Sequence, residues 1–171
     1  ALTLYGGQTI NGQANSGIYI NTAGQDATIA NNIALGAGQI WTVKTGRSLT
    51  VNGVISGAQT LGFYGGGNFV LGGANTNTGN VTVDAATVTV NSGAALFCST
   101  WGYSGARTLT IQNGGTVVAQ SWANGATNFW GTDNDAAQNL ILNNGTFRIK
   151  NSNARTINKG ILVNTGGGTI T

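Results

Sequence analysis

Short β-strand patterns follow one another along the whole chain, and no stretch has the 3.6-residue apolar period of an amphipathic helix. Apolar and polar residues alternate in several of these patterns, as at 81–83, 88–90 and 109–111. Alternation of this kind places one face of a strand in a core and the other face in water. The chain is therefore expected to be all-β, with strands at 2–5, 17–20, 27–30, 40–43, 48–51, 69–71, 81–83, 87–90, 108–111, 116–119, 140–142, 146–150, 161–163 and 169–171.

Two all-β architectures fit this pattern. The Asn-Gly dipeptides favour a meander of antiparallel hairpins, because Asn and Gly tolerate the positive φ of tight turns. They occur at 11–12, 52–53, 113–114, 124–125 and 144–145. Imperfect internal repeats favour a solenoid instead, in which each unit buries its apolar face against the next: segment 47–51 is similar to 107–111, and 109–114 is similar to 140–145.

The repeats decide for the solenoid. Parallel strands need a long return path, and no segment has the pattern of a crossover helix, so further strands of the same coil must supply it. We predict a right-handed parallel β-helix, a single-stranded solenoid, over residues 1–171 as one domain. Roughly 20–25 residues per coil would give about seven or eight coils. Because the sequence stops in what reads as mid-coil at 166–171, we expect it to be part of a longer chain or fibre, or to be covered at this end by another subunit.

Composition argues against several classes of function. Charged residues make up 6% of the chain, and there is no His and no Glu. A Ser-His-Asp triad is therefore impossible, and Cys98 alone cannot build an ordinary zinc site. Cys98 is expected to be a small buried residue. The basic residues form no run, which argues against nucleic acid as a partner. With no apolar stretch of about 20 residues, this segment is not expected to insert into a membrane.

Two groups of residues are candidate sites. Aromatic side chains gather in the expected loops at 99–106 and 121–139, where they either offer platforms for a ligand such as a glycan or pack on the flank of the helix: Trp101, Tyr103, Trp122, Phe129 and Trp130. Asp133 and Asp135 either share a Ca²⁺ ion or lie in a solvated turn. No other cofactor is expected.

One stretch carries a family resemblance. Residues 67–90 contain Gly73-Ala74-Asn75-Thr76-Asn77-Thr78-Gly79 followed by two Thr/Val strands. This segment resembles the autotransporter-associated β-strand repeat, except that Asn77 stands where a tyrosine is usual. The resemblance implies a β-helical passenger that is exported to the bacterial surface, where such passengers serve as adhesins, aggregation factors, proteases or stalks.

The expected function is therefore not enzymatic. We expect a secreted or cell-surface β-helix that acts as a structural stalk, an adhesin or a self-associating fibre subunit. Its partners would be further coils, joined end to end, or a glycan or other ligand on a host or cell surface. The alternative is a β-helix that binds or degrades polysaccharide. Arg148-Ile149-Lys150 resembles a signature of polygalacturonases, but the histidine motif of that family is absent.

Overall fold

The computed structural model describes residues 1–91, 94, 96, 107–120, 139–150 and 160–171. These residues form 17 strands in three sheets, and every pair of adjacent strands is parallel. Among them there is no helix, and so none that is long and apolar enough to cross a membrane.

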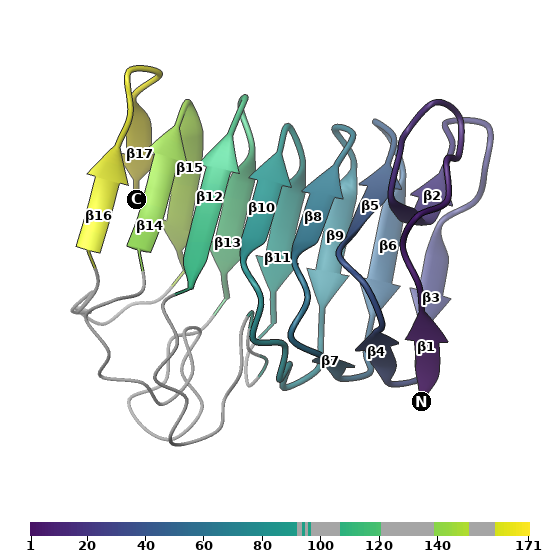
Figure 1. Ribbon diagram of the computed structural model, residues 1–171. Helices are drawn as coiled ribbons and strands as arrows, with labels where there is room; N and C mark the ends of the chain where they lie inside the picture. Colours follow the sequence, from purple (N-terminus) through teal and green to yellow (C-terminus); the bar gives the residue numbers. More distant parts are fainter. Residues whose placement is uncertain (92–93, 95, 97–106, 121–138, 151–159) are drawn as a thin grey trace.

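Two long sheets face each other, and a short one covers the first coils (Figure 1). The front sheet contains β2 (Ser16–Ile20), β5 (Gln39–Val43), β8 (Leu61–Tyr64), β10 (Val81–Asp84), β12 (Thr108–Gln112), β14 (Asn139–Asn143) and β16 (Gly160–Val163). The back sheet contains β3 (Ala27–Ile29), β6 (Ser48–Val51), β9 (Asn68–Leu71), β11 (Thr87–Val90), β13 (Thr116–Ala119), β15 (Gly145–Ile149) and β17 (Gly168–Ile170). The short sheet contains β1 (Leu2–Leu4), β4 (Ile33–Leu35) and β7 (Ile55–Ser56).

The path of the chain confirms the parallel β-helix. In Figure 1 it climbs each front strand, turns, descends the back strand and advances from right to left, which is a right-handed coil. Each long sheet therefore collects one strand from each of seven successive coils. The rival prediction of an antiparallel meander is wrong, because antiparallel pairing among the described residues is confined to isolated bridges such as Ile10–Gln13.

Coil length agrees with the expected 20–25 residues in the first part of the chain. Hydrogen bonds between equivalent places in neighbouring coils join residues that are 20 to 23 positions apart. The separation rises to 28 between Asn80 and Thr108, across the connection that contains residues 97–106. Coils of unequal length thus share one register, because the extra residues enter between strands and not within them.

A side chain placed just before a strand helps to fix the start of the next coil. Asp26 Oδ1 accepts a hydrogen bond from the backbone amide of Ser48, the first residue of β6, at 2.9 Å. Asn80 Oδ1 accepts one from the amide of Thr108, the first residue of β12, also at 2.9 Å. The first amide of a strand thereby gains a partner that a short polar side chain can supply.

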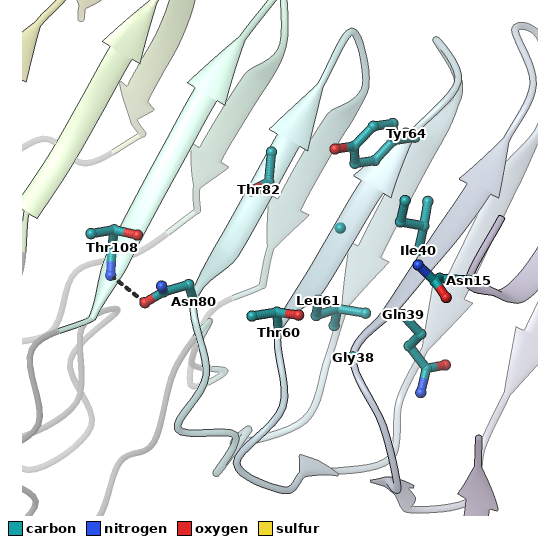
Figure 2. A pocket seen from close by; sticks show the side chains of 11 residues that line it. Asn15, Gly38, Gln39, Ile40, Thr60, Leu61, Tyr64, Asn80, Thr82 and Thr108 are labelled. Atoms are coloured by element: carbon teal, nitrogen blue, oxygen red, sulfur yellow. Dashed lines mark hydrogen bonds between the residues drawn. The ribbon is translucent and has the colours of Figure 1, made fainter. Parts of the chain in front are cut away.

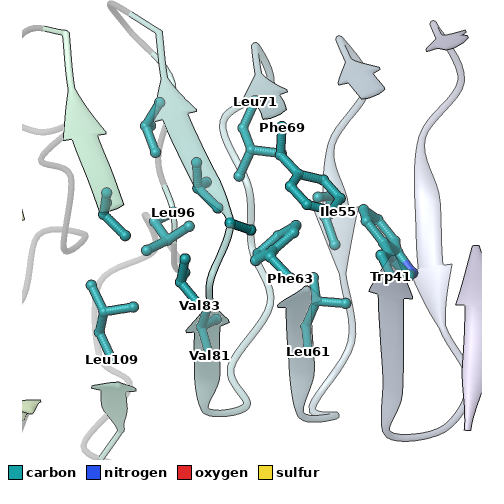
Figure 3. Packing of buried hydrophobic residues seen from close by; sticks show 14 of the residues in the cluster. Trp41, Ile55, Leu61, Phe63, Phe69, Leu71, Val81, Val83, Leu96 and Leu109 are labelled. Atoms are coloured by element: carbon teal, nitrogen blue, oxygen red, sulfur yellow. The ribbon is translucent and has the colours of Figure 1, made fainter. Parts of the chain in front are cut away.

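Alternate side chains point between the two long sheets and stack in columns (Figure 3). One column joins Trp41, Phe63, Val83, Ile111 and Leu142, which pair in register from β5 to β14. The ring centroids of Trp41 and Phe63 lie 5.8 Å apart at 86°, and those of Phe63 and Phe69 lie 4.9 Å apart at 66°. These are edge-to-face contacts, which aromatic pairs favour over a face-to-face sandwich.

The buried indole of Trp41 is also satisfied as a hydrogen-bond donor. Trp41 Nε1 donates to Gln39 Oε1 at 2.8 Å, and Gln39 Nε2 donates to the carbonyl of Leu4 at 3.1 Å. An indole N–H without a partner in the core would cost part of what burial of the ring contributes. Gln39 therefore allows a tryptophan to begin the aromatic column.

The Asn-Gly dipeptides form corners as well as turns. Asn113 and Gly114 both have positive φ, 54° and 80°, and they join β12 of the front sheet to β13 of the back sheet. Asn144, with φ 58°, occupies the equivalent corner one coil later. Positive φ at two successive residues normally reverses the chain into a hairpin. At Asn113 and Gly114 the same values turn the chain from the front sheet to the back sheet. This difference explains why the dipeptides alone pointed to the wrong architecture.

The motif at 73–79 lies beside the short sheet. Asn75 is buried, and its Oδ1 accepts the backbone amide of Ile55 at 2.8 Å, 20 residues earlier. The backbone amides of Thr76 and Asn77 both donate to the Ile55 carbonyl, at 2.8 and 3.1 Å. A Cβ at Gly73 would collide with the carbonyl of Gly53, so only glycine lets the two coils approach this closely. The motif therefore continues the pairing of coils where strands are absent.

We predict that Phe63→Ala lowers the free energy of unfolding by about 3–5 kcal/mol, because it empties the middle of the aromatic column. Equilibrium urea unfolding, followed by tryptophan fluorescence and circular dichroism, measures the change. Tyr5→Ala is the control, since Tyr5 is 70% exposed and should change stability little. Equal effects of the two substitutions would contradict the packing described for this column.

We predict that Asn75→Ala destabilises the fold by about 1–3 kcal/mol, because the buried amide of Ile55 loses its acceptor. The matched control is Asn32→Ala, which removes the same kind of bond, to the amide of Val54 at 2.9 Å, at an exposed position where water replaces it. The urea midpoint should be highest for the wild type, lower for Asn32→Ala and lowest for Asn75→Ala. The reverse order of the two variants would be inconsistent with a special role for the buried bond.

Candidate functional site

The residues predicted to form sites lie outside the described residues. This holds for the aromatic group Trp101, Tyr103, Trp122, Phe129 and Trp130, for the carboxylates Asp133 and Asp135, and for Cys98. Ligand binding at the aromatic residues and calcium binding at the two carboxylates therefore stay predictions. In chain order, Trp101 and Tyr103 fall between β11 and β12. The other aromatic residues and both carboxylates fall between β13 and β14. Both connections lead from the back sheet to the front sheet.

A groove opens on the outer face of the front sheet, over β5, β8 and β10 (Figure 2). Its volume is about 490 Å³, within the range of about 300–1,000 Å³ that is usual for small-molecule sites. The lining residues are Asn15, Gly38, Gln39, Ile40, Thr60, Leu61, Gly62, Tyr64, Asn80, Thr82 and Thr108. None of them carries a charge at neutral pH.

The groove exists because one outward position has no side chain. Ile40, Gly62 and Thr82 pair in register across β5, β8 and β10, so they form one outward row. Gly62 has no side chain, yet it is buried, because the Tyr64 ring occupies the space above it. A Cβ at Gly62 would lie 2.6 Å from Cε2 of Tyr64 and 3.3 Å from Cγ1 of Ile40. The missing side chain therefore lets the Tyr64 ring lean over the strand and form one end of the groove (Figure 2).

Tyr64 is the titratable residue of this groove. Partial burial raises the pKa of its phenol above the usual 10.0, and the negative charge of Asp84 raises it further. Asp84 of β10 pairs in register with Tyr64 of β8, so the two side chains are neighbours on the outer face. Asp84 accepts hydrogen bonds from Gln112 Nε2 at 2.6 Å and from Asn113 Nδ2 at 3.0 Å. The phenol thus keeps its proton at neutral pH and presents an apolar ring with a hydrogen-bonding tip.

Polar side chains surround the other end of the groove. Asn15 lies on one side, and Asn80 and Thr108 lie on the other, with Thr60 between them (Figure 2). Asn80 uses its Oδ1 for the Thr108 amide, which leaves its Nδ2 as a donor. Within the part of the chain that the structure describes, the side chains of Asn15, Thr60 and Thr82 make no hydrogen bond. Amide and hydroxyl groups that have bonding capacity left among the described residues therefore line a groove that has one aromatic wall.

This arrangement suits binding better than acid–base chemistry. The lining holds no carboxylate, imidazole or amine, so it offers no general acid or base that works near neutral pH. Across the described ranges, no three metal-ligating side chains come together. The chemistry available in the groove is hydrogen bonding by neutral groups and contact with an aromatic ring.

The groove could not be predicted from the sequence without β8, which was not among the expected strands. No strand was predicted at residues 61–64. Glycine in mid-strand is unfavourable, and no long alternation surrounds Gly62. The available signal was the pattern of Leu61 and Phe63 flanking Gly62. A glycine between two inward apolar residues can mark a strand that another group approaches closely, and here that group is the Tyr64 ring.

Comparison with known proteins gives one informative similarity. The chain is 35% identical, over 146 residues, to a protein named adhesin BmaC autotransporter from Brucella suis biovar 1 (strain 1330). The similarity covers 73% of this chain but only 4% of the adhesin, so the chain spans a small part of that protein's length. No family model and no solved structure matches the chain.

Sequence and architecture agree with each other. The motif at 73–79 pointed to autotransporter passengers, the fold is the parallel β-helix that this resemblance implied, and the similar protein is named an autotransporter adhesin. The resemblance predicted from the sequence is thereby confirmed: the chain is similar in sequence to part of a protein named an autotransporter adhesin, and it has the parallel strand pairing that the resemblance implied.

Proposed function

We propose that this chain is a rigid, non-catalytic segment of a bacterial surface adhesin, which holds adhesive surfaces away from the cell. The observation that carries the proposal is the unbroken parallel pairing of seven coils in a chain that resembles an adhesin. Strands about 4.8 Å apart make each seven-stranded sheet about 29 Å long, and every further coil would add the same step. Such a shaft gains length without a change of cross-section.

The outer surface supports this role. Outward positions of the back sheet place Asn68, Thr87, Thr116, Thr146 and Thr169 in one row. Neutral polar side chains keep the shaft hydrated without the self-repulsion that a high net charge would bring. With no His and no Glu in the chain, the usual acid–base residues of hydrolases are scarce, which favours binding over catalysis.

The adhesive role predicts that beads coated with the folded chain adhere to cultured epithelial cells severalfold more densely than beads coated with albumin. Counting bound beads by microscopy after washing measures the effect. Beads coated with the same chain after heat unfolding are the control for nonspecific contact. Equal adhesion of native, unfolded and albumin beads would rule out an adhesive surface on this segment.

Self-association is a second candidate role, favoured by the apolar side chains of β16. Ile161 and Val163 continue the inward columns of Leu140 and Leu142 but are 43% and 53% exposed. A further coil placed against β16 and β17 would cover them and would satisfy the free strand edges. We propose that a neighbouring passenger coil, or a second copy joined end to end, supplies this coil.

End-to-end association predicts that the sedimentation coefficient of the pure chain rises with concentration. Val163→Asp should weaken this rise, because it places a charge at the open end of an inward column. Leu162→Asp on the same strand is the matched control, since Leu162 belongs to the outward row that continues Ile141. A single monomeric boundary at every concentration would contradict the proposal.

A further inference from the structure

The groove over Gly62 has a combination of features that points to one class of ligand. It joins an aromatic ring, a floor of backbone and a rim of amides and hydroxyls, and its lining carries no charge. We propose that this groove binds a neutral oligosaccharide, with Tyr64 as the stacking platform and Asn15, Thr60, Asn80 and Thr82 as hydrogen-bonding groups. The inference names a ligand class for the adhesive role proposed above, and rests on that role.

The first argument is the accessibility of the ring. Tyr64 stands on the outer face of the front sheet, half-buried against Gly62 and Ile40, with its remaining surface toward the groove (Figure 2). A tyrosine ring offers an apolar face and loses little side-chain entropy when a ligand covers it. The C–H groups on one face of a pyranose supply a flat apolar surface of matching kind.

The second argument is the chemistry of the rim. A sugar presents hydroxyl groups that both donate and accept, and asparagine and threonine side chains do the same. Three of the four rim side chains have no hydrogen bond among the described residues, and Asn80 keeps its Nδ2 group. Binding would therefore replace water at these groups without breaking a contact of the fold.

The third argument is the absence of charge. An anionic ligand would lose hydration in the groove without meeting a cation, and Asp84 beside Tyr64 would repel it. A cationic ligand would find one carboxylate, and that one is already engaged by Gln112 and Asn113. A neutral ligand avoids both costs.

The shape of the groove suits a chain of rings more than a single small molecule. Its lining extends along β8, from Thr60 just before the strand to Tyr64 at its end, and across the neighbouring strands β5 and β10. With a rise of about 3.3 Å per residue along a strand, these two residues mark a path about 13 Å long. An oligosaccharide laid along β8 would meet the tyrosine at one end and the amide rim at the other.

The test is binding of four tetrasaccharides to the ¹⁵N-labelled chain: cellotetraose, maltotetraose, tetra-N-acetylchitotetraose and the anionic tetragalacturonate. We expect at least one neutral tetrasaccharide to shift the backbone amides of Gly62, Tyr64 and Thr82 in a saturable way, with the anionic one weaker. Shifts with none of the neutral sugars, or a preference for tetragalacturonate, would overturn the proposal. So would saturable shifts of these amides by a neutral Ser/Gly/Asn peptide and by no sugar.

Three variants locate the binding. Tyr64→Ala should weaken the affinity at least tenfold by removing the platform, and Gly62→Ser should do so by displacing the Tyr64 ring, because a Cβ at Gly62 would lie 2.6 Å from Tyr64 Cε2. Tyr19→Ala is the matched control, because Tyr19 lies on the same outer face but outside the groove. If Gly62→Ser fails to fold, Tyr64→Ala still decides the question. An equal loss in Tyr19→Ala would overturn the assignment to this groove.

The bead assay separates this inference from the proposed function. If the chain adheres to cells but binds none of the sugars, the groove proposal fails and the adhesive role stands. If the chain binds a sugar through Tyr64 but its beads adhere no better than albumin beads, the adhesive role fails and the groove stands. Adhesion that is lost in Tyr64→Ala and kept in Tyr19→Ala supports both.

Discussion

Hydrogen bonding between successive coils determines how the side chains of this protein stack and which of them face the core. Each strand pairs in parallel with its counterpart one coil away, so each side chain lies on the side chain of an equivalent position. A position that faces inward does so in every coil, and a misfit is felt by the coils on both sides. Several local features meet this constraint. They are the aromatic contacts of Phe63 with Trp41 and Phe69, the buried acceptor of Asn75 and the glycine at 73.

The same constraint explains how much could be foreseen from the sequence. Strands with clear alternation, such as β10 and β12, were expected where they occur, and repeats separated by turns indicated a solenoid. The strands β4, β7 and β8 were missed. They are short or contain glycine, and they exist because neighbouring coils offer hydrogen bonds to them. Local preference cannot reveal a strand that its neighbours impose. The Asn-Gly corners misled for a related reason, since the turn is local but the sheet it leads to is not.

The candidate site shows a similar division. A cluster of large aromatic residues is visible in a sequence, and it drew attention to Trp101, Trp122 and Trp130. The groove on the front sheet is built from residues of several coils, from Asn15 to Thr108. These residues form no cluster in the sequence that could reveal the groove. What creates it is one glycine between Ile40 and Thr82, and that relation exists only once the register is known. Sites on a solenoid are defined across coils, whereas sequence motifs run along them.

The hydrogen bond from Asn80 to the first amide of β12 has a consequence for how such a shaft can vary. It fixes where the next strand begins although the two partners are 28 positions apart in the sequence. The position of the following coil therefore does not depend on the length of the connection before it. A lineage could lengthen, shorten or exchange that connection without disturbing the columns inside. The shaft then behaves as a frame with interchangeable attachments, in which recognition and rigidity can change independently of each other.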